Sequence, residues 1–251
     1  MARLMIGAGG TGGHVYPALA VAEVLHKSPH AHKLVFVGTR GGGGFEKRLV
    51  EASPIQFDAY REVFAGPIVG VNPLRALSSV IKMGLGLLQA LIVILQDRPQ
   101  AILLTGGWAN VPLAIAGWIT RIPMLVYLPD IEPGTTIRVL SRFAKTIATT
   151  VPESSSYFRE GQTVTTGYPL RSAVTAATRE AALLHFGLDS ARKTLLVTGG
   201  SRGARTINIA LGNILSDLLE ENVQVIHVTG ELDYQRTIEQ VGDLAQHTHY
   251  H

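Results

Sequence analysis

Short apolar runs alternate with amphipathic stretches along the chain. The runs are continuous rather than alternating, which is typical of strands that are buried on both faces of a sheet. They occupy residues 3–8, 33–38, 101–107, 123–128, 145–150 and 163–167. Because strands of this kind need helices on both sides, the pattern predicts an α/β fold with a doubly wound parallel sheet.

Two of the intervening stretches are predicted to be helices. Residues 17–25 carry apolar side chains at the spacing of one helix face, and Pro17 suits the first turn of such a helix. The face consists of Ala18, Val21, Ala22 and Leu25. A second, more apolar helix is expected over 111–119.

The same order of elements begins again near residue 193. We predict a strand over 193–200, a helix over 204–219 and a strand over 223–230. The helix face is expected to hold Ile207, Ala210, Leu211, Ile214 and Leu218. This repetition predicts two Rossmann-like domains, 1–166 and 167–251. The second is too short to be complete, so we expect the chain to be a fragment.

The segment 76–95 is apolar and long enough to cross a bilayer. Lys82, two serines, a glutamine and two glycines dilute it, and a charge at the centre of a bilayer is costly. A buried helix, a helix that docks on a membrane surface and a transmembrane span all remain open. Arg75 and Lys82 lie beside the apolar face, which is typical of a helix that docks on a membrane surface.

Composition narrows the class of protein. The chain has 251 residues, no cysteine and a formal net charge of +3. The lack of cysteine excludes disulfide scaffolds, Cys-ligated zinc and Cys nucleophiles. The charge is too small to indicate nucleic-acid binding, and the N-terminal residues do not resemble a signal peptide, so we expect a cytoplasmic protein.

Two glycine-rich stretches follow predicted strands. "GAGGTGGH" (7–14) and "GGSRGAR" (199–205) each lie between a strand and a helix start, where bare backbone N–H groups and the helix dipole favour an anion. The first also matches the dinucleotide fingerprint. However, the fingerprint also requires an acidic residue at the end of the second strand, and the stretch there, "VGTRGGGG" (37–44), contains none. Arg40 in this stretch at best suits the 2′-phosphate of NADP. An NADP-dependent oxidoreductase is therefore one alternative.

Five motifs in order resemble the MurG family of bacterial N-acetylglucosaminyltransferases. They are "GGTGGHVYPALAVAEVL" (9–25), "VGTRGGGGFEKRLV" (37–50), "LLTGGWANVPLAIAGWITRIPMLVYL" (103–128), "TGYPLR" (166–171) and "GGSRGAR" (199–205). The resemblance covers nearly the whole chain.

The resemblance implies a GT-B type fold with two Rossmann-like domains. It also implies inverting transfer of N-acetylglucosamine from UDP to the muramyl 4-hydroxyl of an undecaprenyl-linked acceptor, converting lipid I to lipid II in peptidoglycan synthesis. No cofactor or metal is expected. The N-terminal domain would bind the acceptor and dock peripherally on the cytoplasmic face of the membrane, and the C-terminal domain would bind UDP-N-acetylglucosamine.

Site residues follow from the resemblance by position. The first loop supplies the candidate substrate contacts Thr11, Gly12 and Gly13. Arg171 corresponds to a donor-binding arginine, and an arginine suits a diphosphate. In the second loop, Ser201 corresponds to a serine that contacts the nucleotide sugar. Its neighbours Gly199, Gly200 and Gly203 shape that loop, and Gly200 is a further candidate contact.

Several positions depart from the family pattern. "YLPD" (127–130) stands where His-Glu-Gln-Asn is usual, so Asp130 replaces a substrate-binding asparagine and lacks its amide donor. Arg202 replaces a glutamine and Tyr168 an asparagine. The family's ribose-binding glutamate and sugar-binding glutamine have no counterpart up to residue 251. These departures leave a non-catalytic sugar-nucleotide or lipid-binding relative as another alternative.

His14 closes the first glycine loop, and its ordinary pKa suits general base catalysis on the acceptor hydroxyl. It is equally suited to orient that hydroxyl, or to hydrogen-bond the loop or an acceptor phosphate. Asp130 and Glu132 are competing candidate bases.

Overall fold

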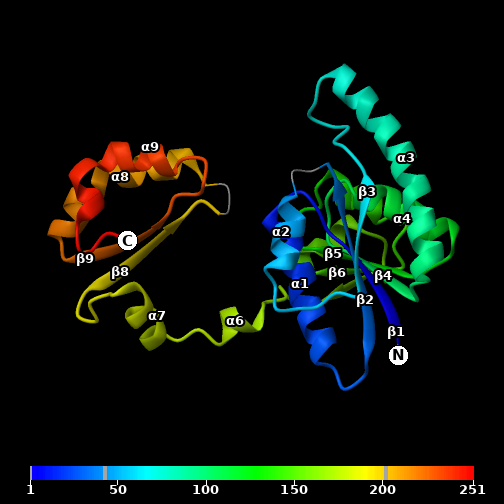
Figure 1. Ribbon diagram of the computed structural model, residues 1–251, viewed down its shortest axis with the longest axis horizontal. Coiled ribbons are helices and arrows are strands. Elements are labelled where there is room, and N and C mark those ends of the chain that lie inside the picture. The colour runs from blue at the N-terminus through cyan, green and yellow to red at the C-terminus, as the bar shows by residue number, and fades with distance from the viewer. Residues whose placement is uncertain (1, 42–43, 201–202) are drawn as a thin grey trace. The chain divides into compact units, whose positions relative to one another are not determined.

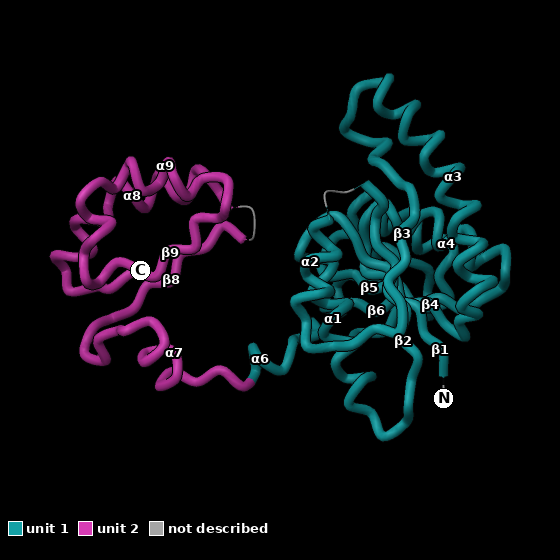
Figure 2. The backbone as a smooth tube through the Cα atoms, in the orientation of Figure 1, with its two compact units in different colours: residues 1–175 teal, residues 176–251 magenta. Residues whose placement is uncertain are grey.

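The computed structural model describes residues 2–41, 44–200 and 203–251 (Figure 1). The chain divides into two compact units, Met1–Thr175 and Ala176–His251 (Figure 2).

Unit 1 contains one seven-stranded sheet in the order β3-β2-β1-β4-β5-β6-β7, and all neighbouring strands are parallel. The predicted doubly wound α/β class is therefore confirmed. The strands are β1 (Ala2–Gly7), β2 (His32–Arg40), β3 (Ala59–Phe64), β4 (Ala101–Leu104), β5 (Met124–Leu128), β6 (Thr146–Thr149) and β7 (Thr163–Thr165).

Helices cover both faces of this sheet. They are α1 (Gly12–Lys27), α2 (Phe45–Glu51), α3 (Pro73–Asp97), α4 (Asn110–Ile119) and α5 (Thr135–Leu140), followed by the 3-10 turn η1 (Pro152–Tyr157). One core cluster packs α1 and α2 against residues such as Ile6 and Phe36. The other packs α3, α4 and α5 around Met5, Ile102 and Val126. Alternate residues of the central strands thus face opposite layers, as the continuous apolar runs predict.

The strand order reverses beside β1, because β2 and β4 lie on its two sides. The loops that follow β1 and β4 therefore leave the same edge of the sheet side by side. In open parallel sheets this is where ligands bind.

Helix α1 begins earlier than the sequence pattern predicts. It starts at Gly12 with Thr11 as N-cap, so Pro17 lies inside the helix rather than in its first turn. The amides of His14 and Val15 both bond the Thr11 carbonyl, which winds the glycines into the helix. Because proline has no N–H, the usual bond to the Gly13 carbonyl is missing.

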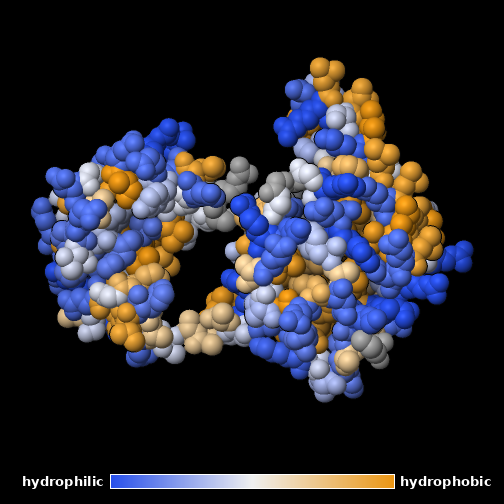
Figure 3. Space-filling model, viewed as in Figure 1, coloured by the Kyte–Doolittle hydropathy of each residue, from blue (hydrophilic) through white to orange (hydrophobic). Residues whose placement is uncertain are grey.

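Helix α3 is mostly exposed, so the buried-helix alternative is wrong. Only 28% of its most apolar 18-residue window is buried. The helix is long and apolar enough to cross a bilayer, but length and composition alone are weak evidence for a transmembrane span. Its exposed apolar side chains are Leu74, Leu77, Val80, Ile81, Leu85, Leu88, Ile92 and Leu95. They form part of the hydrophobic surface along α3 in Figure 3.

Unit 2 has a two-stranded parallel sheet of β8 (Lys193–Thr198) and β9 (Val223–Val228). Its helices are α7 (Arg179–Phe186), α8 (Arg205–Glu220) and α9 (Tyr234–Val241), with the 3-10 turn η2 (Gly242–Gln246). Tyr250 adds an isolated parallel bridge to Val225.

The buried face of α8 lies one residue position away from the face that the sequence pattern predicts. The buried side chains are Asn208, Leu211, Leu215 and Leu219, whereas Ile207 and Ile214 are exposed. The packing partners of α8 are β9 and α9, which contact the face that carries Asn208 and Leu215. Helical periodicity alone does not fix which of two neighbouring apolar stripes faces the core.

The segment between the units belongs to unit 1 as far as Thr175 and contains the short helix α6 (Ser172–Thr175). This boundary lies later than the one predicted after residue 166. The reason is a set of contacts with α1: the Arg171 guanidinium stacks on the Tyr16 ring, and Ser172 hydrogen-bonds Glu23.

Candidate functional site

The loop after β1 is held in place from the neighbouring strand and helix. Gly10 has a φ of +89°, and its backbone N–H donates to Glu46 Oε1 of α2 at 2.8 Å. A Cβ on Gly9 would lie 2.7 Å from Thr39 Oγ1 at the end of β2. Glycine is therefore required at position 9 by space and at position 10 by backbone conformation. Glu46, 2% exposed, acts here as a structural acceptor.

His14 lies in the first turn of α1, and its ring orientation is determined by the loop. Its Nδ1 is 3.0 Å from the Gly9 carbonyl oxygen and 3.3 Å from Thr11 Oγ1. A carbonyl oxygen only accepts, so the neutral ring carries its proton on Nδ1 and presents the lone pair on Nε2. That is the form in which a histidine accepts a proton from a substrate hydroxyl.

The loop after β4 forms the other wall around His14. Gly106 has a φ of +116°, and a Cβ there would lie 2.5 Å from the His14 Cδ2 atom. Thr105 Oγ1 donates to the His14 carbonyl at 2.7 Å. Asn110 Nδ2 donates to the carbonyls of Gly7 and Gly106 at 3.0 and 2.6 Å, which joins the two loops. Sequence reasoning did not identify Thr105, Gly106 or Asn110 as supports, although the motif "LLTGGWAN" contains them.

Burial lowers the pKa of His14 below its usual 6.5. The hydrogen bond with Gly9 and the negative charge of Asp130 oppose this effect by raising the pKa. Desolvation prevails, so the ring is neutral at physiological pH. A neutral, oriented imidazole is suited to general base catalysis.

Asp130 follows β5 and is exposed. Its charge raises the pKa of the nearby Tyr127 and Tyr168, although burial is the larger cause for both tyrosines. The two rings meet edge to face with centroids 6.2 Å apart, and the Tyr127 hydroxyl lies 3.0 Å from Thr150 Oγ1. The charge of Asp130 thus acts on both tyrosines and also on His14. Glu132 instead interacts with Tyr157 and does not contribute to the His14 pKa.

Arg171 lies against α1. Its guanidinium carbon is 4.3 Å from the centre of the Tyr16 ring, a cation–π distance. Next to it, the Ser172 amide and hydroxyl both donate to Glu23, which also pairs with Lys27 at 2.7 Å. The hydrogen bond from Lys27, which is the largest cause, and those from Ser172 lower the pKa of Glu23 to about 2.

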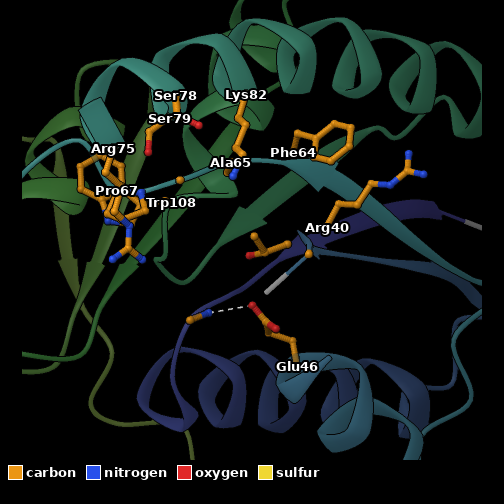
Figure 4. A pocket seen from close by; sticks show the side chains of 14 residues that line it. Arg40, Glu46, Phe64, Ala65, Pro67, Arg75, Ser78, Ser79, Lys82 and Trp108 are labelled. Carbon is orange, nitrogen blue, oxygen red and sulfur yellow. Dashed lines mark hydrogen bonds between the residues drawn. The ribbon is translucent and has the colours of Figure 1, made fainter. Parts of the chain in front are cut away.

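An open cavity of about 350 Å³ lies beside the glycine loop (Figure 4). Its walls come from Gly10, Thr39, Arg40, Gly41, Glu46, Phe64, Ala65, Gly66, Pro67, Arg75, Ser78, Ser79, Lys82 and Trp108. Arg40 lies over the Phe64 ring at 4.8 Å. The size is within the usual range of small-ligand sites.

The second glycine loop lies in unit 2, after β8. Gly200 and Gly203 both have a φ of +77°, and the Gly203 amide bonds the Gly200 carbonyl at 3.0 Å. A Cβ on Gly203 would collide with the Thr229 carbonyl, so this loop packs closely on the loop after β9. Ser201 and Arg202 lie outside the described residues.

The structure therefore brings Thr11, Gly12, Gly13 and His14 together at the start of α1, with Asp130 close enough to influence His14. Arg171 contacts the same helix because its guanidinium lies over the Tyr16 ring, and Gly200 belongs to unit 2. Within the described ranges 2–41, 44–200 and 203–251, no group of three or more His, Asp or Glu side chains is arranged to hold a metal ion.

Two family models match the chain. The Glycosyltransferase family 28 N-terminal domain matches residues 4–149, more than half of the chain. The Glycosyltransferase family 28 C-terminal domain matches residues 194–251.

Among curated proteins, the chain is similar to UDP-N-acetylglucosamine–N-acetylmuramyl-(pentapeptide) pyrophosphoryl-undecaprenol N-acetylglucosamine transferases. The relative from Roseiflexus sp. (strain RS-1) is 36% identical over 91% of this chain and 59% of its own length. The relative from Moorella thermoacetica is 34% identical over 95% of this chain and 64% of its own. The chain thus spans less than two thirds of the length of these relatives.

Solved structures share the fold. Acinetobacter baumannii MurG aligns with a TM-score of 0.68 at 24% identity, covering 100% of this chain and 67% of that one. UDP-GlcNAc 2-epimerase from Neisseria meningitidis bound to UDP-GlcNAc aligns with a TM-score of 0.63 at 12% identity, covering 100% and 71%. At these identities the likeness concerns the fold alone, which is of the expected GT-B type.

Proposed function

Because the chain belongs to glycosyltransferase family 28, we propose that the whole protein transfers N-acetylglucosamine from UDP-N-acetylglucosamine to a lipid-linked muramyl acceptor. The acceptor is undecaprenyl-diphospho-muramoylpentapeptide, so the reaction converts lipid I to lipid II in peptidoglycan synthesis. The observation that carries this proposal is 34–36% identity to transferases of that name over 91–95% of the chain.

The geometry of His14 supports a direct displacement. The muramyl 4-hydroxyl oxygen attacks the anomeric carbon of the donor sugar while the bond from that carbon to the UDP oxygen breaks on the opposite face. One C–O bond forms, one breaks, and the configuration inverts. The hydroxyl proton passes to His14 Nε2, which is the free acceptor of the ring.

The two units take different substrates in this proposal. Unit 1 binds the acceptor with Thr11, Gly12 and Gly13 near His14, while Asp130 accepts a hydrogen bond from it. Unit 2 binds UDP-N-acetylglucosamine through its glycine loop, with Gly200 and Ser201 as contacts. Arg171, a planar cation in the segment that joins the units, is suited to the donor diphosphate.

The exposed face of α3 supports peripheral docking on the cytoplasmic face of the membrane. Eight exposed apolar side chains lie along this helix, and Trp118 and Ile119 at the end of the contacting helix α4 are 61% and 50% exposed. A contiguous apolar surface of this kind marks an interaction site.

The direct test uses the whole protein, radiolabelled UDP-N-acetylglucosamine and a lipid-linked muramyl acceptor. We expect transfer of the label to the lipid fraction without added metal. A protein that binds both substrates but transfers no label, under conditions where a MurG relative is active, would contradict the proposal.

The departures at "YLPD" favour one second candidate, a relative that binds sugar nucleotide or lipid without turnover. Retained acceptor binding without transfer would identify it. The NADP-dependent oxidoreductase is not favoured, since the family models and the curated relatives are glycosyltransferases.

A further inference from the structure

Helix α3 carries two different stripes. The exposed apolar side chains of its first half include Leu74, Leu77, Ile81 and Leu85. A second stripe, at the i, i+3, i+4, i+7 spacing of one helix face, consists of Arg75, Ser78, Ser79 and Lys82, and all four of these residues line the cavity beside the glycine loop. The helix thus presents one stripe of apolar side chains to the outside and a second stripe of cations and hydroxyls to the open cavity.

The polar stripe is held in place by close packing. A Cβ on Gly86 would collide with the Phe64 carbonyl, so only glycine permits this approach of α3 to β3. Gln89 Oε1 accepts from the Phe64 amide at 2.8 Å, and Asn72 caps the helix by accepting from the Arg75 amide at 2.8 Å. Ser79 is buried against Gly66, whose Cβ position lies 2.6 Å from Ser79 Oγ.

The charges of the cavity are unbalanced. Among the described residues, no carboxylate forms an ion pair with Arg75 or Lys82. The one acid in the wall, Glu46, bonds the Gly10 amide on the opposite side. Figure 4 shows Lys82 and Arg75 extending from α3 into the space above Glu46, whereas Arg40 extends along Phe64. Two cations and two hydroxyls on one wall, with the cavity's single acid already bonded to Gly10 on the other, form a site for phosphate oxygens.

We propose that Arg75, Ser78, Ser79 and Lys82 bind the diphosphate of an isoprenyl-linked substrate. This inference rests on the proposed function and assigns a subsite within it. The same helix would contact the membrane with its apolar stripe and hold, on its polar stripe, the anion that joins the lipid to the sugar. The cavity also contains Gly10, so a diphosphate there lies next to the loop that orients His14.

The test measures binding of farnesyl diphosphate, a soluble isoprenyl diphosphate, to the whole protein by titration calorimetry. We expect Lys82→Met and Arg75→Gln each to weaken binding about tenfold or more, because each removes a charged hydrogen bond to phosphate. Lys145→Met is the matched control, since Lys145 is exposed and does not line the cavity. Equal affinity in all variants, or no binding by the unmodified protein, overturns the proposal.

Two further arms separate the sources of phosphate. UDP binding should be unchanged in Lys82→Met; weakened UDP binding with unchanged farnesyl diphosphate binding would assign the cation to the donor. Phosphatidylglycerol vesicles provide the other arm. If Lys82→Met weakens vesicle binding but leaves farnesyl diphosphate binding unchanged, the cations serve bilayer lipids and the proposal fails.

The transfer assay distinguishes this subsite from the proposed function itself. With lipid-linked acceptor, Lys82→Met should raise the acceptor KM about tenfold and leave the KM for UDP-N-acetylglucosamine unchanged. If the unmodified protein transfers no sugar but binds farnesyl diphosphate through Lys82, the proposed function fails and the subsite stands.

Discussion

At the scale of single residues, the candidate site depends on how one imidazole is held. His14 donates from Nδ1 to the Gly9 carbonyl, and Gly106 leaves the space that the ring occupies. His14→Gln keeps a side chain of similar reach but removes the basic lone pair. We expect kcat to fall roughly a hundred- to ten-thousandfold with little change in either KM. His26→Gln, at an exposed position of the same helix, should retain full activity in the transfer assay.

The pH dependence of kcat/KM tests the charge that acts on His14. The base must be neutral, so activity is lost as pH falls through the His14 pKa, which burial holds below 6.5. Asp130 raises that pKa by favouring the imidazolium. The variant Asp130→Asn should therefore move the acidic limb of the kcat/KM profile to still lower pH. Glu132→Gln should leave the limb in place. A limb that disappears in Asp130→Asn would make Asp130 the base instead.

Gly106 is the residue on which the space for His14 depends. Gly106→Ala puts a methyl group against the ring and forces alanine into a φ of +116°. We expect a loss of about 1–3 kcal/mol in the free energy of unfolding, together with a loss of activity as the ring is displaced. Gly134→Ala is the control, because Gly134 has a φ of −64° and open space around its Cβ position. Urea unfolding that gives equal stabilities for both variants would contradict this reading.

At the scale of elements, apolar runs predicted the central strands because those strands are buried from both sides. Strand β3 was not predicted. It lies at the edge of the sheet, and Arg61 and Glu62 interrupt its apolar pattern. Arg61 instead pairs with Asp97 at the end of α3, a contact between residues 36 apart in the sequence. The edge position alone does not hide a strand, because the other edge strand, β7, was predicted from the run at 163–167. The charged residues within β3 are what removed its apolar pattern.

The same limit applies to the candidate site. The glycine turns and His14 were recognisable from the sequence because a tight turn before a helix start requires glycines that are adjacent along the chain, as in "GAGGTGGH" (7–14). Their supports were not recognisable, because Thr105 reaches His14 across 91 residues and Asn110 reaches Gly7 across 103. Such pairs depend on the register of β1 with β4, which no short motif encodes.

The exposed stripe of α3 yields a prediction at this scale. Ile81→Glu and Leu88→Glu place a charge where we propose contact with a bilayer, and each should weaken binding of the whole protein to phosphatidylglycerol vesicles about tenfold or more. Folding stability should change little, since both side chains are already exposed. Val24→Glu, at a 68% exposed position of α1, should bind vesicles normally. Equal loss of binding in all three variants would point to bulk charge rather than to α3.

At the scale of the whole molecule, the two units have unequal cores. Unit 1 buries both faces of its sheet in two clusters, whereas the cluster of unit 2 consists of Leu211, Leu215, Leu219, Val225 and Val241. In β8, Leu195 and Leu196 remain 37% and 60% exposed. A parallel strand with exposed leucines lacks the covering layer that such sheets require.

This difference predicts unequal protection in hydrogen exchange of the 251-residue chain. Local opening costs least where few apolar side chains are buried, so the amides of β8 and β9 should exchange roughly a hundredfold or more faster than those of β1 and β4. Mass spectrometry of peptic peptides measures both sets in one sample, with the intrinsic exchange rates of each sequence as the internal reference. Equal protection of the four strands would mean that the two units unfold as one cooperative body, and the stability of unit 2 would then have to come from contacts outside its own core.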